Sequence, residues 1–131
     1  MVTFGYTIAY VADVDKALSF FEQAFGMQRK FITPEQDYGE LSTGATTLSF
    51  AAHSLGQANL KDGYISATDS ATPLGMEIAL VTTDVHATHS AAIEHGATEL
   101  KAPELKPWGQ TVSYVRCPSG ILIELCTPVA S

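Results

Sequence analysis

Residues 107–128 read P-W-G-Q-T-V-S-Y-V-R-C-P-S-G-I-L-I-E-L-C-T-P, and two strand-like runs in this stretch give the first indication of the fold. Residues 110–116 and 121–127 are rich in β-branched and aromatic side chains, and the C-P-S-G segment between them has the composition of a turn. This pattern predicts a β-hairpin. Its second arm is apolar except for Glu124.

Glu124 is the residue of this hairpin that most needs an explanation. A charge inside an apolar strand is costly to bury unless it has a partner, a cation or a ligand. Side chains in a strand alternate between two faces, so Glu124 either faces water while Ile123 and Leu125 face the core, or points inward. Both interpretations stay open at this point.

Length, composition and charge limit the kinds of protein that the chain can be. A chain of 131 residues is large enough for one domain with its own core. Two cysteines and no secretory leader pattern predict a reduced, cytoplasmic protein, and no apolar run reaches the roughly 20 residues that cross a bilayer. A net charge of −7 without a basic cluster argues against a nucleic-acid partner.

The first part of the chain has the element order β-α-β-β-β. Asp13 is a helix N-cap, apolar residues recur at helical spacing after it, and Gly26 ends the helix. The predicted strands are residues 4–11, 27–33, 38–42 and 46–52.

The order β-α-β-β-β then starts again. Residues 53–73 lack periodicity and predict a linker of about 20 residues that is a partly ordered lid. After it we predict a strand at 76–81, a helix capped by Asp84, a short strand at 98–101 and the hairpin. The prediction is one domain with module 1 at 1–52, the linker at 53–73 and module 2 at 74–131.

The repeat and two motifs carry a family resemblance. Matching features lie about 70 residues apart, as for two copies of one unit. V-A-D-V-D-K-A-L-S-F-F-E-Q-A-F-G-M at 11–27 and V-R-C-P-S-G-I-L-I-E-L at 115–125 resemble the vicinal oxygen chelate superfamily, the glyoxalase, bleomycin-resistance and extradiol-dioxygenase group. The resemblance implies an α+β fold in which two tandem βαβββ modules form a cup-shaped, curved mixed sheet with helices outside, and it implies a homodimer.

Metal-dependent members of that family place ligands at four strand positions. Alignment on the helix-capping aspartates puts Tyr6 and Glu77 at two of them, and alignment on the glycines before the last strands puts Leu48 and Glu124 at the others. Leu48 has no donor atom and a neutral phenol is a poor ligand, so we expect no tightly bound metal and no cofactor. A weakly held divalent cation between the two glutamates is the alternative.

Glu77 and Glu124 have a second possible use. Two carboxyl groups in an apolar cup raise the pKa of at least one, and such a pair moves a proton or accepts hydrogen bonds from a ligand. Trp108 is either core packing or a flat wall for a ligand. The predicted ligand-binding residues are Tyr6, Leu48, Phe50, Trp108 and Gln110.

His53 begins the predicted linker, where a role at the mouth of the cup is one interpretation, whereas two other histidines and both cysteines are assigned no chemistry. His86 and His89 have the spacing of a metal pair on a helix, but helices lie outside the sheet in the resembled fold, so both are predicted to be solvated. Cys117 and Cys126 are predicted to be inert strand residues.

The leading functional hypothesis is a metal-independent protein that sequesters a hydrophobic or cationic small molecule in an apolar cup. The alternative is a glyoxalase-related lyase or isomerase, in which Glu77 and Glu124 transfer a proton or hold a weak divalent cation. A third interpretation is an interaction module whose cup is filled.

Overall fold

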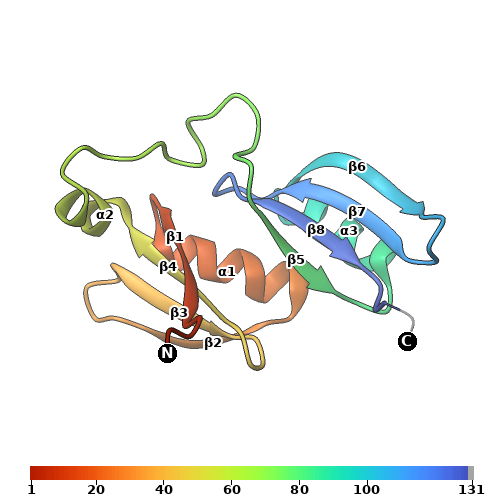
Figure 1. The fold of residues 1–131 in the computed structure, drawn as a ribbon, viewed down its shortest axis with the longest axis horizontal. Coiled ribbons are helices and arrows are strands. Elements are labelled where there is room, and N and C mark those ends of the chain that lie inside the picture. Colours follow the sequence, from red (N-terminus) through yellow and green to blue (C-terminus); the bar gives the residue numbers. More distant parts are fainter. Residues whose placement is uncertain (130–131) are drawn as a thin grey trace. The chain divides into compact units, whose positions relative to one another are not determined.

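The computed structural model describes residues 1–129, so residues 130 and 131, at the end of the second predicted module, lie outside the described residues. The elements are β1 (Tyr6–Val11), α1 (Val14–Phe25), β2 (Gln28–Ile32), β3 (Tyr38–Ser42), β4 (Thr47–Ala52), α2 (His53–Asn59), β5 (Glu77–Val81), α3 (Val85–Glu94), β6 (Thr98–Leu105), β7 (Thr111–Arg116) and β8 (Leu122–Cys126) (Figure 1). The predicted α+β class and the double β-α-β-β-β order are confirmed.

The chain divides into two compact units, residues 1–66 and the residues from Ala67 onward. Each unit contains one four-stranded mixed sheet, with the strand order β1-β4-β3-β2 in the first and β5-β8-β7-β6 in the second. The pairs β1–β4 and β5–β8 are parallel, and the other neighbouring strands are antiparallel. The second sheet therefore repeats the topology of the first.

Each sheet is covered on one face by the helix that follows its first strand. Asp13 caps α1 by accepting a hydrogen bond from the Lys16 amide at 3.0 Å, and Gly26 ends it in the left-handed conformation (φ 69°). Asp84 caps α3 in the same way through the Ala87 amide. The helix α1 packs on β2, β3 and β4, and α3 packs on β6, β7 and β8.

Apolar side chains between each helix and its sheet form the two cores. In the first unit Phe21 of α1 is fully buried against Phe50 of β4, with ring centroids 5.3 Å apart. The helix approaches β3 so closely that a Cβ atom on Gly39 would lie 2.6 Å from Leu18. The corresponding core of the second unit contains Val85, Val115, Ile123 and Leu125. No helix of the described residues is long and apolar enough to cross a membrane.

The predicted linker has more structure than its sequence suggests. Residues 53–59 form α2, which the lack of periodicity did not predict, because so short a helix depends on tertiary contacts rather than on an amphipathic repeat. Gly56 makes room for Tyr64, whose ring lies so close that a Cβ atom at position 56 would be 2.6 Å from it. Tyr64 also stacks on Tyr10 of β1, with ring centroids 4.8 Å apart.

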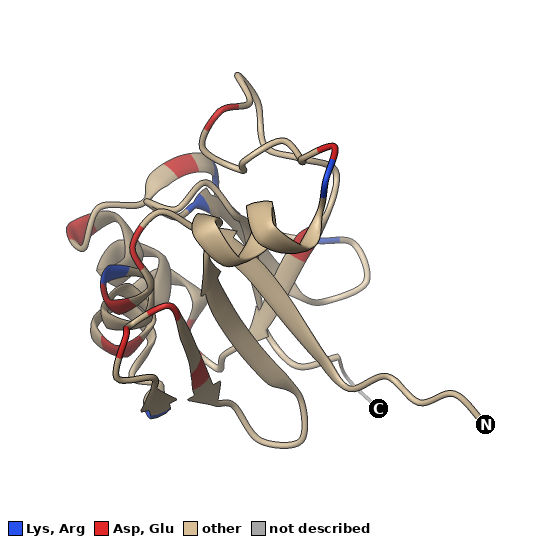
Figure 2. Cartoon of the chain, turned by 90° about the vertical axis from the view of Figure 1, so that its left-hand side faces the viewer, with Lys and Arg blue, Asp and Glu red and all other residues tan. Residues whose placement is uncertain are grey.

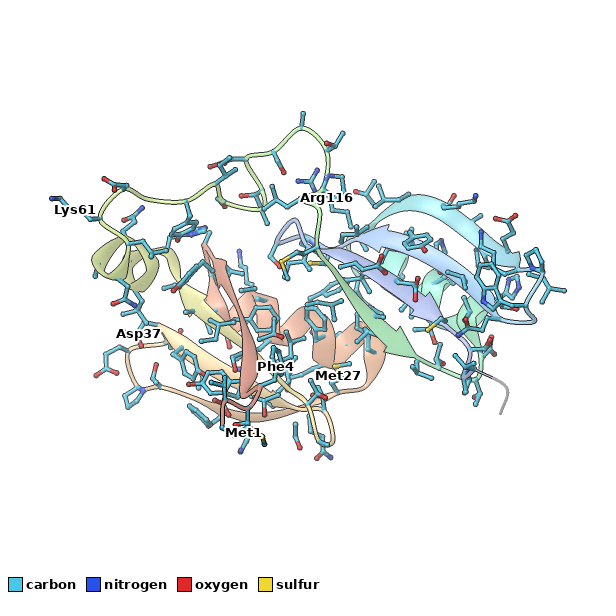
Figure 3. The ribbon with its side chains drawn as sticks, viewed as in Figure 1. Met1, Phe4, Met27, Asp37, Lys61 and Arg116 are labelled. Carbon is cyan, nitrogen blue, oxygen red and sulfur yellow. The ribbon has the colours of Figure 1, made fainter. Side chains whose placement is uncertain are left out.

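The remaining part of the predicted linker belongs to the second unit. The Arg116 guanidinium donates to the carbonyl oxygens of Ala67 at 2.6 Å and Ser70 at 3.0 Å (Figure 3). One arginine therefore ties this irregular segment to the end of β7. The division into one domain with a central linker stays a prediction.

The strand predicted at 98–101 extends to Leu105 in β6. Pro103 lies inside β6, and proline cannot donate to a sheet ladder. However, β6 is an edge strand and its register shifts between Lys101 and Glu104, so the missing donor is tolerated.

Candidate functional site

Strand register places Glu124 on the face of the second sheet opposite α3. Its neighbours Ile123 and Leu125 are fully buried on the helix side, so Glu124 points the other way. Glu124 pairs with Ala79 of β5 and Tyr114 of β7, which share its face. We call this surface the second open face, and it carries Glu77, Ala79, Val81, Tyr114, Leu122, Glu124 and Cys126.

Tyr114 and Glu77 contact Glu124 from the two sides. The Tyr114 hydroxyl donates to Glu124 Oε1 at 2.9 Å, and this hydrogen bond, with burial second, raises the pKa of Tyr114 to about 12. Partial burial raises the pKa of Glu77, and the charge of Glu124 and a hydrogen bond with it act in the same direction. The three side chains form what we call the acid cluster.

The two carboxyl groups of the acid cluster have different surroundings. Glu124 accepts a hydrogen bond from Tyr114, while Glu77 has a pKa raised by partial burial and by the neighbouring Glu124, so it holds a proton more readily than an ordinary glutamate. Such a cluster can exchange a proton or accept hydrogen bonds from a cation. The thiol of Cys126 has a pKa raised by burial and then by Glu124, which keeps it protonated and unreactive.

The sequence analysis missed Tyr114, although a signal for it was present. The turn at residues 117–120 closes with a hydrogen bond between the Cys117 amide and the Ile121 carbonyl. Counting outward from that pair places Tyr114 directly opposite Glu124. Cross-strand neighbours of this kind interact on one face of a sheet.

The first sheet shows that Leu48 is not the counterpart of Glu124. Ser49 pairs with Ile8 of β1 and Glu40 of β3, as Glu124 pairs with Ala79 and Tyr114. The sequence alignment that matched Gly44 with Gly120 is wrong by one residue, because the segment between Gly44 and its strand contains one residue more than the segment between Gly120 and its strand. A shift of one residue moves every side chain to the other face.

Leu48 and Phe50 consequently belong to the core rather than to the predicted ligand surface. Both face α1, and Phe50 is fully buried against Phe21. The prediction that they line the cup is corrected by this register.

The predicted residues Tyr6, Trp108 and Gln110 are accessible. Tyr6 occupies the position equivalent to Glu77, and 53% of its surface is exposed. Trp108 lies in the turn between β6 and β7 and is 64% exposed, which excludes core packing. Its indole nitrogen donates to Gln110 Oε1 at 2.7 Å, and Gln110 Nε2 donates to the Thr127 carbonyl at 2.8 Å. A role for these three residues in ligand binding stays a prediction.

The face of the first sheet opposite α1, the first open face, is rich in tyrosine. It carries Tyr6, Ile8, Tyr10, Phe31, Tyr38, Glu40 and Ser49. The Tyr38 hydroxyl donates to Glu40 Oε2 at 2.7 Å, and burial is the main cause of the raised pKa of Tyr38. The sequence analysis did not single out Tyr38, Glu40 or Ser49, because their side chains become neighbours only through strand pairing.

The four ligand positions implied by the resemblance do not fit a transition metal. With Ser49 in place of Leu48, the side chains are the neutral hydroxyls of Tyr6 and Ser49 and the carboxyls of Glu77 and Glu124. None is an imidazole or thiolate, the ligands that zinc and nickel sites favour. Within residues 1–129 no group of three or more His, Cys, Asp or Glu side chains is arranged to hold a metal ion.

His89 is buried, so the prediction that it is solvated is wrong. Its Nδ1 lies 2.9 Å from Ser113 Oγ, and its Nε2 lies 2.7 Å from Glu99 Oε2. His89 is on the side of α3 that packs against β7, whereas His86 is exposed. With both ring nitrogens hydrogen-bonded, His89 joins α3 to the sheet.

The charge distribution agrees with the net negative charge. Acidic positions are spread over loops, helices and strands, and the fewer basic positions do not gather into a stripe (Figure 2).

Comparisons with known proteins support one family and one fold. The family model described as Glyoxalase/Bleomycin resistance protein/Dioxygenase superfamily matches residues 3–125. A glyoxalase-related enzyme from Fulvimarina pelagi is similar with a TM-score of 0.81 and 15% identity, over 98% of this chain and 89% of its own. No curated protein matches the chain in sequence.

Two further solved structures have the same fold. Hypothetical protein SA1046 from S. aureus has a TM-score of 0.80 and 18% identity, over 98% of this chain and 95% of its own. A glyoxalase/bleomycin resistance protein/dioxygenase family enzyme from Burkholderia phytofirmans PsJN has a TM-score of 0.78 and 20% identity, over 96% of this chain and 98% of its own. At these identities the similarity concerns the fold alone.

Proposed function

The chain belongs to the Glyoxalase/Bleomycin resistance protein/Dioxygenase superfamily, and we propose that it binds a small hydrophobic or cationic molecule without a metal. The observation that carries the proposal is the acid cluster on the second open face. A partly shielded carboxylate, held by Tyr114 at 2.9 Å, is a ready acceptor for a cationic group.

Apolar surface beside the acid cluster supports a ligand with a hydrophobic body. Val81 follows Glu77 and Ala79 along the same face of β5 and is 66% exposed. An exposed apolar side chain next to a carboxylate matches a molecule that is apolar at one end and positively charged at the other.

Binding of tetraphenylphosphonium, measured by isothermal titration calorimetry, tests this proposal. We expect Glu124→Gln to weaken binding about tenfold, the effect of losing one charge-assisted contact. The neutral analogue triphenylphosphine oxide should be affected less. Glu35→Gln is the matched control because Glu35 is an exposed glutamate outside the strands.

Two results would refute the proposal. One is equal affinity of wild type and Glu124→Gln for the cation. The other is loss of tetraphenylphosphonium binding after treatment with a metal chelator, since the proposed site uses side chains alone.

A lyase or isomerase is the second candidate, because the acid cluster contains one carboxyl group with a raised pKa next to one that accepts a hydrogen bond. In that role Glu124 removes a proton from a bound substrate and Glu77 supplies one. Glu124→Gln would then abolish turnover while substrate binding is largely retained. Under the binding hypothesis the same substitution weakens binding itself.

The predicted homodimer belongs to the same proposal. Sedimentation equilibrium checks it directly, because a dimer has twice the 14.0 kDa mass of the chain.

A further inference from the structure

A histidine and two hydroxyl groups meet where α2 lies beside the segment that follows it. His53 is the first residue of α2, and both nitrogens of its ring have a hydroxyl partner. Its Nδ1 atom lies 2.6 Å from the Tyr64 hydroxyl, and its Nε2 atom lies 3.2 Å from Ser66 Oγ. We call these three residues of the first unit the serine cluster.

Two packing contacts fix Tyr64 in this cluster. Its ring stacks on Tyr10, with ring centroids 4.8 Å apart, and it occupies the space that a Cβ atom on Gly56 would need. Partial burial raises the pKa of Tyr64, so the phenol stays neutral at physiological pH. Tyr64 therefore holds the His53 ring through a neutral hydrogen bond at Nδ1.

The hydrogen bond at Nδ1 leaves the other ring nitrogen ready to act as a base. When Nδ1–H donates to the Tyr64 oxygen, Nε2 carries a lone pair that accepts the Ser66 hydroxyl proton. A serine within hydrogen-bond reach of a histidine, which is held in turn by a third group, is the arrangement that makes a serine nucleophilic. All three side chains are half-buried, so a small reactant can reach Ser66 from solvent.

We propose that the serine cluster is an acyl-transfer site for small esters with a good leaving group. Ser66 Oγ forms a bond to the ester carbonyl carbon, and its proton passes to His53 Nε2. The bond from that carbon to the leaving oxygen then breaks, and His53 returns the proton to the departing alcohol. Water, activated by the same nitrogen, hydrolyses the acyl-serine to a carboxylic acid and restores Ser66.

The chemistry of Tyr64 limits the class of substrate. A neutral phenol stabilises the imidazolium that forms on His53 less strongly than a carboxylate does. We therefore assign activated esters, such as aryl esters, rather than amides. The serine cluster shares no residue with the acid cluster, so this inference is independent of the function proposed above.

The test uses 4-nitrophenyl acetate. Absorbance follows the release of 4-nitrophenolate, and peptide mass spectrometry after an acid quench locates the acetyl group. We expect acetylation of Ser66 in the wild type. His53→Gln should slow it about a hundredfold, as for loss of a general base. Tyr64→Phe keeps the ring that stacks on Tyr10 and should slow it about tenfold, as for loss of one hydrogen bond.

Matched control variants make the result specific. Ser42→Ala and His86→Gln change an exposed serine and an exposed histidine, and Ser66 should be acetylated in both as fast as in the wild type. Far-UV circular dichroism establishes that each variant is folded.

Three results would overturn the inference. The first is acetylation of lysines or of the amino terminus with none on Ser66. The second is release of 4-nitrophenolate by Ser66→Ala at the wild-type rate. The third is acetylation of Ser66 in His53→Gln as fast as in the wild type, because the hydrogen bonds of His53 would then only hold α2 to the segment that follows it.

Discussion

Two fully buried serines should respond to alanine substitution to different extents. Ser49 in β4 and Ser113 in β7 are both completely inaccessible. Ser113 Oγ lies 2.9 Å from His89 Nδ1, whereas the Ser49 hydroxyl interacts with that of Tyr38, which donates its own proton to Glu40. Ser49→Ala and Ser113→Ala remove the same hydroxyl from similar strand environments. The pair therefore isolates the hydrogen bond from the change in side-chain volume.

The expected magnitudes follow from the partners. A buried hydroxyl without a hydrogen bond costs about 1–3 kcal/mol, and removal of one oxygen forfeits only a few dispersion contacts of about 0.1–0.2 kcal/mol each. Ser49→Ala should change the free energy of unfolding by about 1 kcal/mol or less, because Tyr38 keeps its hydrogen bond to Glu40. Ser113→Ala should decrease it by about 1–3 kcal/mol, because the His89 ring nitrogen is left buried without its partner.

Urea unfolding followed by far-UV circular dichroism measures both effects, and thermal scans should show shifts of roughly 4 °C per kcal/mol for a chain of this size. We expect Ser113→Ala to be the least stable of the three proteins and Ser49→Ala to lie close to wild type. A Ser49→Ala variant destabilised as much as Ser113→Ala would refute the reasoning, because it would mean that the contact of Ser49 with Tyr38 stabilises the fold as strongly as the contact of Ser113 with His89.

Two more predictions concern the second unit. The pKa of Tyr114 is raised from the ordinary value of 10 to about 12. The folded state is therefore stabilised by the neutral phenol at every pH below 10, and this stabilisation is lost as pH rises through about 12. In an absorbance titration at 295 nm, the step near pH 12 should disappear in Tyr114→Phe and move to lower pH in Glu124→Gln, while the raised pKa of Tyr38 stays in both variants. An unchanged titration curve in Tyr114→Phe above about pH 11 contradicts the assignment. Arg116→Lys keeps the positive charge but loses the planar guanidinium that donates to the carbonyls of Ala67 and Ser70. The substitution should lower the free energy of unfolding by about 1–3 kcal/mol. It should also speed cleavage by Asp-N protease before Asp69. Unchanged cleavage would show that this segment is held by other contacts.

Much of the fold was predictable because its signals are local. Asp13 and Asp84 are hydrogen-bonded helix caps in the structure, and Gly26 ends α1 with the left-handed conformation that glycine adopts easily. Alternation of side chains in 121–125 correctly separated Glu124 from the buried Ile123 and Leu125. In contrast, α2 carries no periodic pattern of its own and was not predicted.

The candidate site was predictable only in part, because it depends on which strands pair and in what register. Glu77 and Glu124 were identified as unusual charges, and the structure brings them together on one face. Leu48 was assigned to the position equivalent to Glu124, which Ser49 occupies in the structure. One extra residue in the preceding turn exchanges the two faces of the strand. Tyr114 and Glu40 were missed for the same reason.

The order of elements, the repeat of the βαβββ unit and the charge in the final strand can all be read from the chain alone, since caps, turns and periodicity act over a few residues. The hydrogen bond from Tyr114 to Glu124, the burial of His89 and the burial of Ser49 cannot. Each depends on contacts between segments distant in sequence, and a shift of one residue in strand register would abolish it.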